Sequence, residues 1–212
     1  MQAASVAQQY SDNVLSIRNT WGKITFPGRF DESERQRLAR LLIIELVMGW
    51  EGMLQLLTNL GLRAELKMPS RFYFAEAVEQ PSQTFRLPEA ELELFDSNKR
   101  ATPFKLSESD IGNIVILVYG ARCVFAHGSS AKTWDNGGAL GLFTQSLSDV
   151  DKRDWYKYYF EALYTELERN DKAALISDIL MENIFEVLLA ISVAWRDAVS
   201  TLTPTTTTQN LV

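Results

Sequence analysis

Apolar residues recur at helical spacing in five separate stretches of the chain, and this periodicity limits the fold more than any other feature. The stretches cover residues 6–21, 38–60, 111–118, 155–167 and 176–195. Each stretch provides an apolar stripe that a helix has to bury against its neighbours. A chain of 212 residues with 46% hydrophobic content is long enough to form one domain with a sizeable core. The pattern therefore predicts an all-α fold in the form of a helical bundle.

Capping signals indicate where two of these helices begin and end. Asp31-Glu-Ser-Glu34 is typical of a helix start with a capping box, and Gly61 is a suitable end for that helix. Ser107-Glu-Ser-Asp110 provides a similar start before apolar residues at helical spacing. Because Gly128 is a common type of helix stop, we expect one helix over residues 108–127.

The helical pattern is lost between about residues 62 and 106, where prolines and mixed charges accumulate. Alternating residues on both sides of a turn-like segment indicate a short β-hairpin. The hairpin is expected from Glu91–Phe95, Asp96–Asn98 and Thr102–Leu106. We expect a single domain over residues 1–202, with this region as an irregular or β-hairpin insertion. The threonine-rich tail, residues 203–212, is expected to be disordered.

Charge and cysteine content exclude several classes of protein. The net charge is -6 and the sequence pI is about 5.0, which argues against a protein that coats nucleic acid through a basic surface. The overall charge does not exclude a local basic pocket. Cys123 is the only cysteine, so an internal disulfide and a multi-cysteine zinc cluster are excluded. One cysteine and one histidine make a poor metal site, and we expect neither a metal nor an organic cofactor.

No stretch of the sequence indicates a membrane or a secretory route. The first six residues lack the cationic segment and apolar block of a secretory signal. The most apolar stretch, Leu41 to Trp50, contains Glu45 and falls short of the roughly 20 apolar residues that span a bilayer. We interpret it as a buried core helix, and we expect a cytoplasmic protein with no membrane contact.

Arg122 and His127 form the motif with the clearest chemical meaning. His127 is the only histidine of the chain, and therefore the one side chain whose unperturbed pKa suits proton transfer near neutral pH. Both residues lie within the last two turns of the expected helix. The helix dipole and the unpaired carbonyl groups favour cationic side chains at that end. Such a cationic pair suits a phosphate group.

This motif resembles the signature of HEPN domains (higher eukaryotes and prokaryotes nucleotide-binding), an arginine followed by a histidine on a helix of an all-helical domain. In that family two domains pair face to face, and many members cleave RNA without a metal. The resemblance implies a HEPN-like homodimer acting on RNA, with Arg122 and His127 as catalytic residues. It also implies a toxin or antiviral effector with an antitoxin or regulatory protein as partner. The family commonly has Asn, Asp or His after the arginine, where this chain has Cys123.

The chemistry of these residue types agrees with that activity. RNA cleavage by its own 2′-hydroxyl needs a group that moves a proton and cationic donors for the charge on the phosphate. His127 suits the first role and Arg122 the second, and a two-fold dimer would supply an acid and a base. Residues near the motif are candidate RNA contacts through stacking or hydrogen bonds. They are Tyr119, Ser129, Ser130, Lys132 and Trp134.

Two other interpretations remain open. His127 suits a helix cap that binds nearby carbonyl groups, and Arg122 suits a salt bridge to Glu45 or Glu51. Cys123 is best interpreted as a small buried hydrophobic side chain, because no second cysteine or histidine is present to activate it. If the motif is not catalytic, the protein would be a HEPN-like module that binds RNA or nucleotide or regulates a partner. If His127 is a cap and Arg122 forms a salt bridge, the protein would be a purely structural interaction protein.

Overall fold

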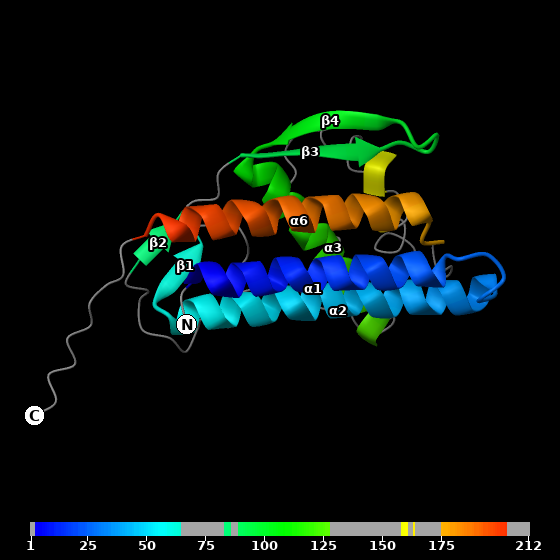
Figure 1. Cartoon of the computed structure of the whole chain (residues 1–212), viewed down its shortest axis with the longest axis horizontal. Coiled ribbons are helices and arrows are strands. Elements are labelled where there is room, and N and C mark those ends of the chain that lie inside the picture. Colours follow the sequence, from blue (N-terminus) through cyan, green and yellow to red (C-terminus); the bar gives the residue numbers. More distant parts are fainter. Residues whose placement is uncertain are drawn as a thin grey trace, which may run out of the picture.

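The structure is a computed structural model that is mostly helical and includes four short strands in its described part (Figure 1). It describes residues 3–64, 83–85, 89–127, 158–160, 163 and 175–202. The elements are α1 (Ala3–Ile24), α2 (Glu32–Asn59), β1 (Leu62–Ala64), β2 (Gln83–Phe85), β3 (Ala90–Phe95), β4 (Ala101–Leu106), α3 (Glu108–His127) and α6 (Asp178–Ser200). Tyr158–Phe160 and Leu163 are helical, as expected for the stretch at 155–167, whose other residues lie outside the described part.

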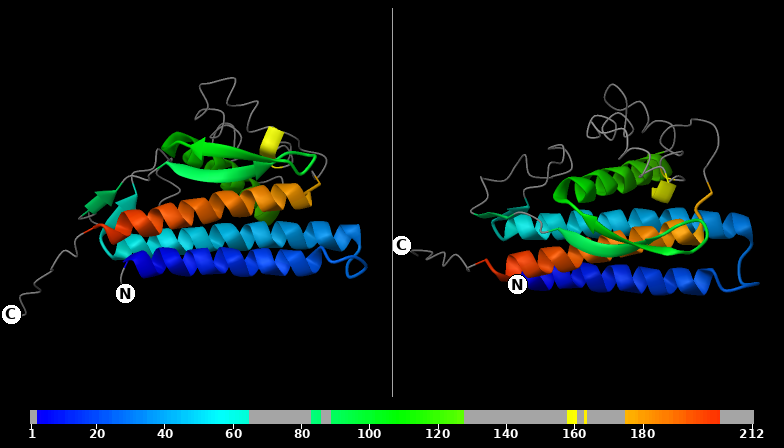
Figure 2. Two further views of the ribbon diagram at one scale, coloured as in Figure 1. Left: turned by 45° about the horizontal axis from the view of Figure 1, so that its top comes forward. Right: turned by 90° about the horizontal axis from the view of Figure 1, so that it is seen from above.

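Helices α1, α2 and α6 lie side by side and form the centre of the molecule, with α1 antiparallel to the other two (Figures 1 and 2). Aromatic rings join the three helices: the ring centroids of Trp50 and Trp195 lie 4.7 Å apart, and those of Tyr10 and Trp50 lie 5.6 Å apart. Helix α3 packs on the side of α2, and the β3–β4 hairpin covers α6. The apolar stripes predicted from the sequence thus meet in one core.

The expected capping signals are present at both helix starts. The Asp31 side chain accepts a hydrogen bond from the Glu34 backbone N–H at 2.8 Å, and the Glu34 side chain accepts one from the Asp31 N–H at 3.1 Å. At the start of α3, the Ser107 N–H donates to the Asp110 carboxylate at 3.0 Å, and the Asp110 N–H donates to the Ser107 hydroxyl at 3.3 Å. These reciprocal bonds satisfy N–H groups that a helix start leaves without partners. Helix α3 has the predicted bounds.

The predicted β-hairpin is confirmed. Strand β3 pairs antiparallel with β4, with Ala90 opposite Leu106 and Phe95 opposite Ala101. The Asp96 carboxylate accepts hydrogen bonds from the backbone N–H groups of Asn98 and Arg100, at 2.8 and 2.9 Å, which holds the turn together and lowers the pKa of Asp96. The second, parallel pair of β1 and β2 was not predicted from the sequence.

Two buried side-chain amides fasten distant segments to the helices. The Asn183 Oδ1 atom accepts from the Phe95 N–H at 2.7 Å, and its Nδ2 atom donates to the Phe95 carbonyl at 3.0 Å. Gln36 makes the same pair of bonds with Ile176, at 2.7 and 3.0 Å. Each amide thereby satisfies one backbone donor and one backbone acceptor, as a neighbouring strand would. Asn183 fixes the hairpin on α6, and Gln36 fixes the start of α6 against α2.

Within the described part, α2 is the one helix that is long and apolar enough to cross a membrane by length and composition alone. Its best 18-residue window has a mean hydropathy of 1.5, and 44% of that window is buried inside the molecule. Ala39, Ile43 and Leu46 are fully buried, which is the expected role of a core helix. Because core helices of soluble proteins pass the same test, the finding does not place the protein in the cell.

Candidate functional site

The motif lies on the last turns of α3, and its Arg122 side chain faces α2. Arg122 is described with its side chain, whereas the structure describes the backbone of His127, the last residue of the helix. Helix α3 begins at the Ser107–Asp110 cap and packs through Ile114, Val118 and other buried residues, so its register places Arg122 toward α2. The motif is therefore held on a packed helix and not on a loop.

Arg122 makes few polar contacts with the described residues. Its Nη2 atom lies 3.5 Å from Oε2 of Glu51 on α2, and its Nη1 atom lies 4.0 Å from the Cys123 sulfur. The Nε atom is buried and has no hydrogen-bond partner. The guanidinium carbon lies 5.8 Å from the Tyr119 ring centroid, close enough for a cation–π interaction. A guanidinium has five N–H donors, of which the Nε donor is shielded from solvent. Among the described residues, the Nη atoms contact only Glu51 and Cys123, so an anion would have to meet the Nη donors.

Of the two carboxylates that the sequence offered as partners for Arg122, the structure selects Glu51. Glu45 lies six residues earlier on α2, about 240° away around the helix at 3.6 residues per turn. It is exposed to solvent, whereas Glu51 is partly buried on the α3 side. The salt-bridge interpretation of Arg122 is thus realised with Glu51, through a single contact at the limit of hydrogen-bond distance.

Cys123 and Tyr119 provide the surroundings of the guanidinium. The Cys123 side chain is buried, which confirms its interpretation as a small hydrophobic residue, and burial raises the pKa of its thiol despite the nearby Arg122. Burial likewise raises the pKa of Tyr119 to about 12, with smaller contributions from Cys123 and Glu51. Both groups stay protonated at neutral pH. A protonated thiol and a protonated phenol are weak nucleophiles.

A second arginine reaches the motif from α2. The guanidinium carbon of Arg40 lies 5.7 Å from the ring centroid of Phe125, a residue between Arg122 and His127. Arg35, earlier on α2, is paired with Asp178 at 3.0 Å. The sequence alone indicates only an ordinary charged face for this part of α2. Its proximity to the motif was missed, because it depends on how α2 and α3 pack and leaves no local signal.

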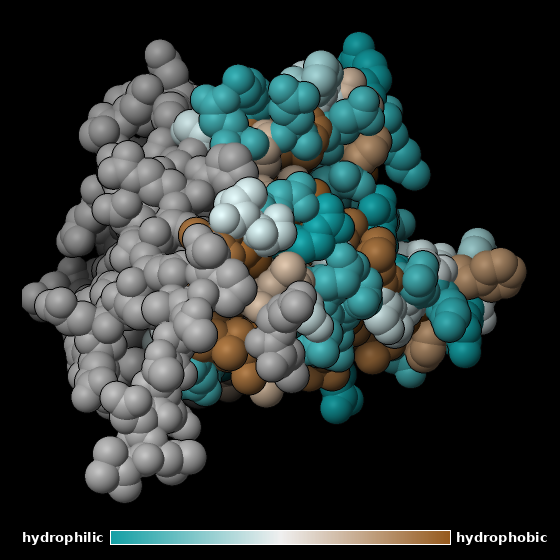
Figure 3. Space-filling view, turned by 60° about the vertical axis from the view of Figure 1, so that its left-hand side comes forward, coloured by the Kyte–Doolittle hydropathy of each residue, from teal (hydrophilic) through white to brown (hydrophobic). Residues whose placement is uncertain are grey.

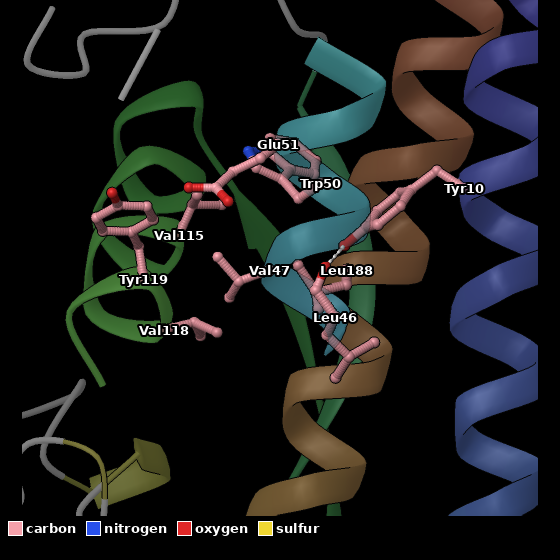
Figure 4. A pocket seen from close by; sticks show the side chains of 9 residues that line it. All are labelled: Tyr10, Leu46, Val47, Trp50, Glu51, Val115, Val118, Tyr119 and Leu188. Carbon is pink, nitrogen blue, oxygen red and sulfur yellow. Dashed lines mark hydrogen bonds between the residues drawn. The ribbon is translucent and has the colours of Figure 1, made fainter. Parts of the chain in front are cut away.

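A small cavity separates α2 and α3 next to Arg122 (Figure 4). Its lining is almost entirely apolar and consists of Tyr10, Leu46, Val47, Trp50, Glu51, Val115, Val118, Tyr119 and Leu188. Figure 4 shows the Glu51 carboxylate reaching from α2 toward α3, where the Tyr119 ring lies. The cavity has a volume of about 10 Å³, roughly the room that one water molecule needs. This cavity is too small for a nucleotide, so a substrate would have to bind on the surface side of Arg122.

Four of the five candidate RNA contacts lie outside the described residues: Ser129, Ser130, Lys132 and Trp134. Tyr119 is described and lies beside Arg122. In the described part of the chain, no group of three or more His, Cys, Asp or Glu side chains is arranged to hold a metal ion. Comparison with known proteins finds no matching family model, no similar curated protein and no similar solved structure.

Proposed function

We propose that the protein is a metal-independent endoribonuclease of the HEPN kind, acting as a toxin or antiviral effector in the cytoplasm. The observation that carries the proposal is the state of Arg122. Its guanidinium is held on a rigid helix, keeps a buried Nε donor without a partner, and lies five residues before the only histidine. An arginine with incompletely paired Nη atoms, on the same helix end as a residue that can transfer a proton, suits phosphate chemistry.

In the proposed reaction, the 2′-hydroxyl of a ribose attacks the adjacent phosphorus and the bond to the 5′-oxygen of the next nucleotide breaks. The products are a 2′,3′-cyclic phosphate and a free 5′-hydroxyl. His127 of one protomer takes the proton of the 2′-hydroxyl, and His127 of its partner donates one to the leaving oxygen. The two copies of Arg122 donate hydrogen bonds to the phosphate oxygens, where charge develops in the transition state.

A composite site needs a homodimer, and α2 offers support for one. Leu41, Met48 and Leu56 are large apolar side chains exposed along one side of α2, the helix that also contacts the motif. On the face drawn in Figure 3, apolar side chains lie between polar ones. Exposed apolar side chains gathered on one helix favour a protein partner, which we propose to be a second copy of this chain.

The test is cleavage of a mixed RNA pool by the purified protein in excess EDTA, with His127→Ala measured beside the wild type. We expect wild-type cleavage to persist in EDTA and to leave 2′,3′-cyclic phosphate ends. The variant should lose at least about 100-fold in rate, because general acid–base catalysis contributes a factor of that order. Circular dichroism of both proteins controls for the fold. Absence of wild-type cleavage would reject the ribonuclease function.

The Arg122–Glu51 pair favours a second candidate, a non-catalytic HEPN-like module that binds RNA or nucleotide or regulates a partner. In that case the motif serves binding or stability, and Cys123 takes the place of the polar residue common in the family. RNA in which every 2′-hydroxyl is methylated lacks the attacking group and reports binding alone. Binding of this RNA without cleavage of ordinary RNA would support the second candidate.

A further inference from the structure

Glu51 and Arg122 carry opposite charges on neighbouring helices in a largely apolar environment. Their side chains are 15% and 20% exposed, and the apolar cavity between α2 and α3 borders Glu51 (Figure 4). Removing charges from water is costly, and a partly buried pair recovers that cost only through close contact and additional hydrogen bonds. The single contact of 3.5 Å between Nη2 and Oε2 provides little of either.

Another arginine of the bundle shows what a closed ion pair looks like in this chain. Arg18 on α1 contacts Glu182 at 2.6 Å and Glu186 at 2.9 Å, both on α6. Its two Nη atoms each have a carboxylate partner. Among the described residues, Arg122 has one carboxylate partner, at 3.5 Å, and its Nε atom is buried without a hydrogen bond. The single contact with Glu51 is therefore better suited to setting the direction of the Arg122 guanidinium than to neutralising its charge.

Three contacts restrict the guanidinium of Arg122 on one side. Glu51 lies at Nη2, the Cys123 sulfur lies at Nη1, and the Tyr119 ring lies against the guanidinium carbon. Of these three, only Glu51 carries a full charge, and only Glu51 comes from the neighbouring helix. It is the contact that relates the direction of the guanidinium to the packing of α3 on α2.

We propose that Glu51 is a positioning residue, which orients Arg122 so that its unused donors meet the scissile phosphate of RNA. The inference rests on the proposed ribonuclease function and names a residue of the same site. For the loss of Glu51, this role and the charge of Glu51 alone predict opposite effects on activity. Removing a negative charge beside an arginine should strengthen the binding of an anion, whereas losing the orientation should slow the chemical step.

The test compares Glu51→Gln and Glu51→Asp with the wild type, and uses Glu182→Gln as a matched control from the Arg18 pair. Glutamine keeps the shape and removes the charge; aspartate keeps the charge and shortens the reach. We expect kcat for RNA cleavage in EDTA to fall about 10-fold to 100-fold in both Glu51 variants, while KM changes less than about threefold. Glu182→Gln should keep the wild-type kcat. A normal kcat in Glu51→Gln would overturn the inference and leave the ribonuclease function intact.

A second measurement tests whether Glu51 orients Arg122 independently of RNA cleavage. Nitrogen-15 relaxation of the arginine Nε–H groups reports how rigidly each guanidinium is held, and the signal that disappears in Arg122→Lys identifies Arg122. We expect this signal to show greater motion in Glu51→Gln and no change in Glu182→Gln. Equal motion of Arg122 in Glu51→Gln and wild type would show that Glu51 does not orient it. Absence of cleavage by the wild type would reject the ribonuclease function separately.

Discussion

Arg18 and Arg122 are the same type of side chain on two sides of the bundle, and they are held in different ways. Arg18 joins α1 to α6 through two short contacts with glutamates, at 2.6 and 2.9 Å. Arg122 joins α3 to α2 through one contact of 3.5 Å and keeps a buried donor without a partner. The comparison shows two ways in which an arginine joins helices: Arg18 makes two close carboxylate contacts, and Arg122 makes one longer contact. A buried Nε atom without a partner does not by itself mark an arginine that is available to a ligand, because Arg35 also has one and is paired with Asp178 at 3.0 Å.

The buried polar groups around α6 extend this contrast. Asn183 and Gln36 each use their amide to satisfy the backbone of one residue on a distant segment. Both amides thus have a matched backbone donor and acceptor. The α2–α3 side combines an apolar cavity with Arg122, whose one carboxylate contact among the described residues is 3.5 Å long. We infer that α6 serves mainly to stabilise the fold, and that the end of α3 serves a ligand.

The largest effect that would test the contrast is expected from Arg122→Ala. If Arg122 donates to the developing charge, its loss should lower the rate of RNA cleavage about 100-fold, or about 3 kcal/mol. Arg18→Ala is the matched control and should leave the rate per folded molecule unchanged. Its cost should appear in urea unfolding, at about 1 kcal/mol, because its ion pairs are partly exposed. Equal rates of RNA cleavage in Arg122→Ala and Arg18→Ala would show that the two arginines do not differ in function.

A smaller effect, on stability alone, is expected from Asn183→Leu. Leucine has a similar size but leaves the N–H and carbonyl groups of Phe95 without their partners, which should lower the free energy of unfolding by about 2 kcal/mol. The matched control is Asn59→Leu, since Asn59 is exposed at the end of α2 and should change stability by less than about 0.5 kcal/mol. Urea unfolding followed by circular dichroism measures both. Similar losses would argue against the amide contact as the anchor of the hairpin.

The smallest effect is expected on the pH dependence of stability, in the alkaline range where Tyr119 loses its proton. Its pKa is raised to about 12 in the folded protein, against about 10 in an unfolded chain. The unfolded state therefore releases the proton first, and the stabilisation present below pH 10 is lost as pH rises toward 12. Tyr119→Phe should lose less stability than the wild type between pH 8 and pH 11. The raised pKa of Tyr10 contributes equally to both proteins. Parallel unfolding free energies would show that Tyr119 is not shielded from water beside Arg122.

Local sequence signals predicted the elements of the fold closely. The Asp31–Glu34 capping box, the α3 helix from residue 108 to 127 and the β3–β4 hairpin all match the structure. Each depends on residues within a few positions of one another, where capping bonds, turn bonds and apolar periodicity act. The HEPN resemblance, the homodimer and the RNA substrate stay predictions. The predicted tail at 203–212 and the candidate RNA contacts from Ser129 to Trp134 lie outside the described residues.

Contacts between distant segments were the part that sequence reasoning did not resolve. The sequence left both Glu45 and Glu51 open as partners of Arg122, and it treated Arg40 as part of a charged face. The parallel pairing of β1 and β2 had no recognised signal, because each strand is only three residues long. The roles of Asn183 and Gln36 were also missed. Their partners lie 88 and 140 positions away, so no local pattern marks them.

The sequence by itself determined where the helices and the hairpin form, and that Arg122 and the only histidine share the end of one helix. The tertiary structure decided that Glu51 is the carboxylate facing Arg122, that Asn183 and Gln36 anchor backbone segments, and that one Arg122 donor is buried without a partner. The physical reason is the range of the forces involved. Helix and turn signals act over about four residues, whereas the Arg122–Glu51 contact spans 71 positions and exists only once α3 has packed on α2.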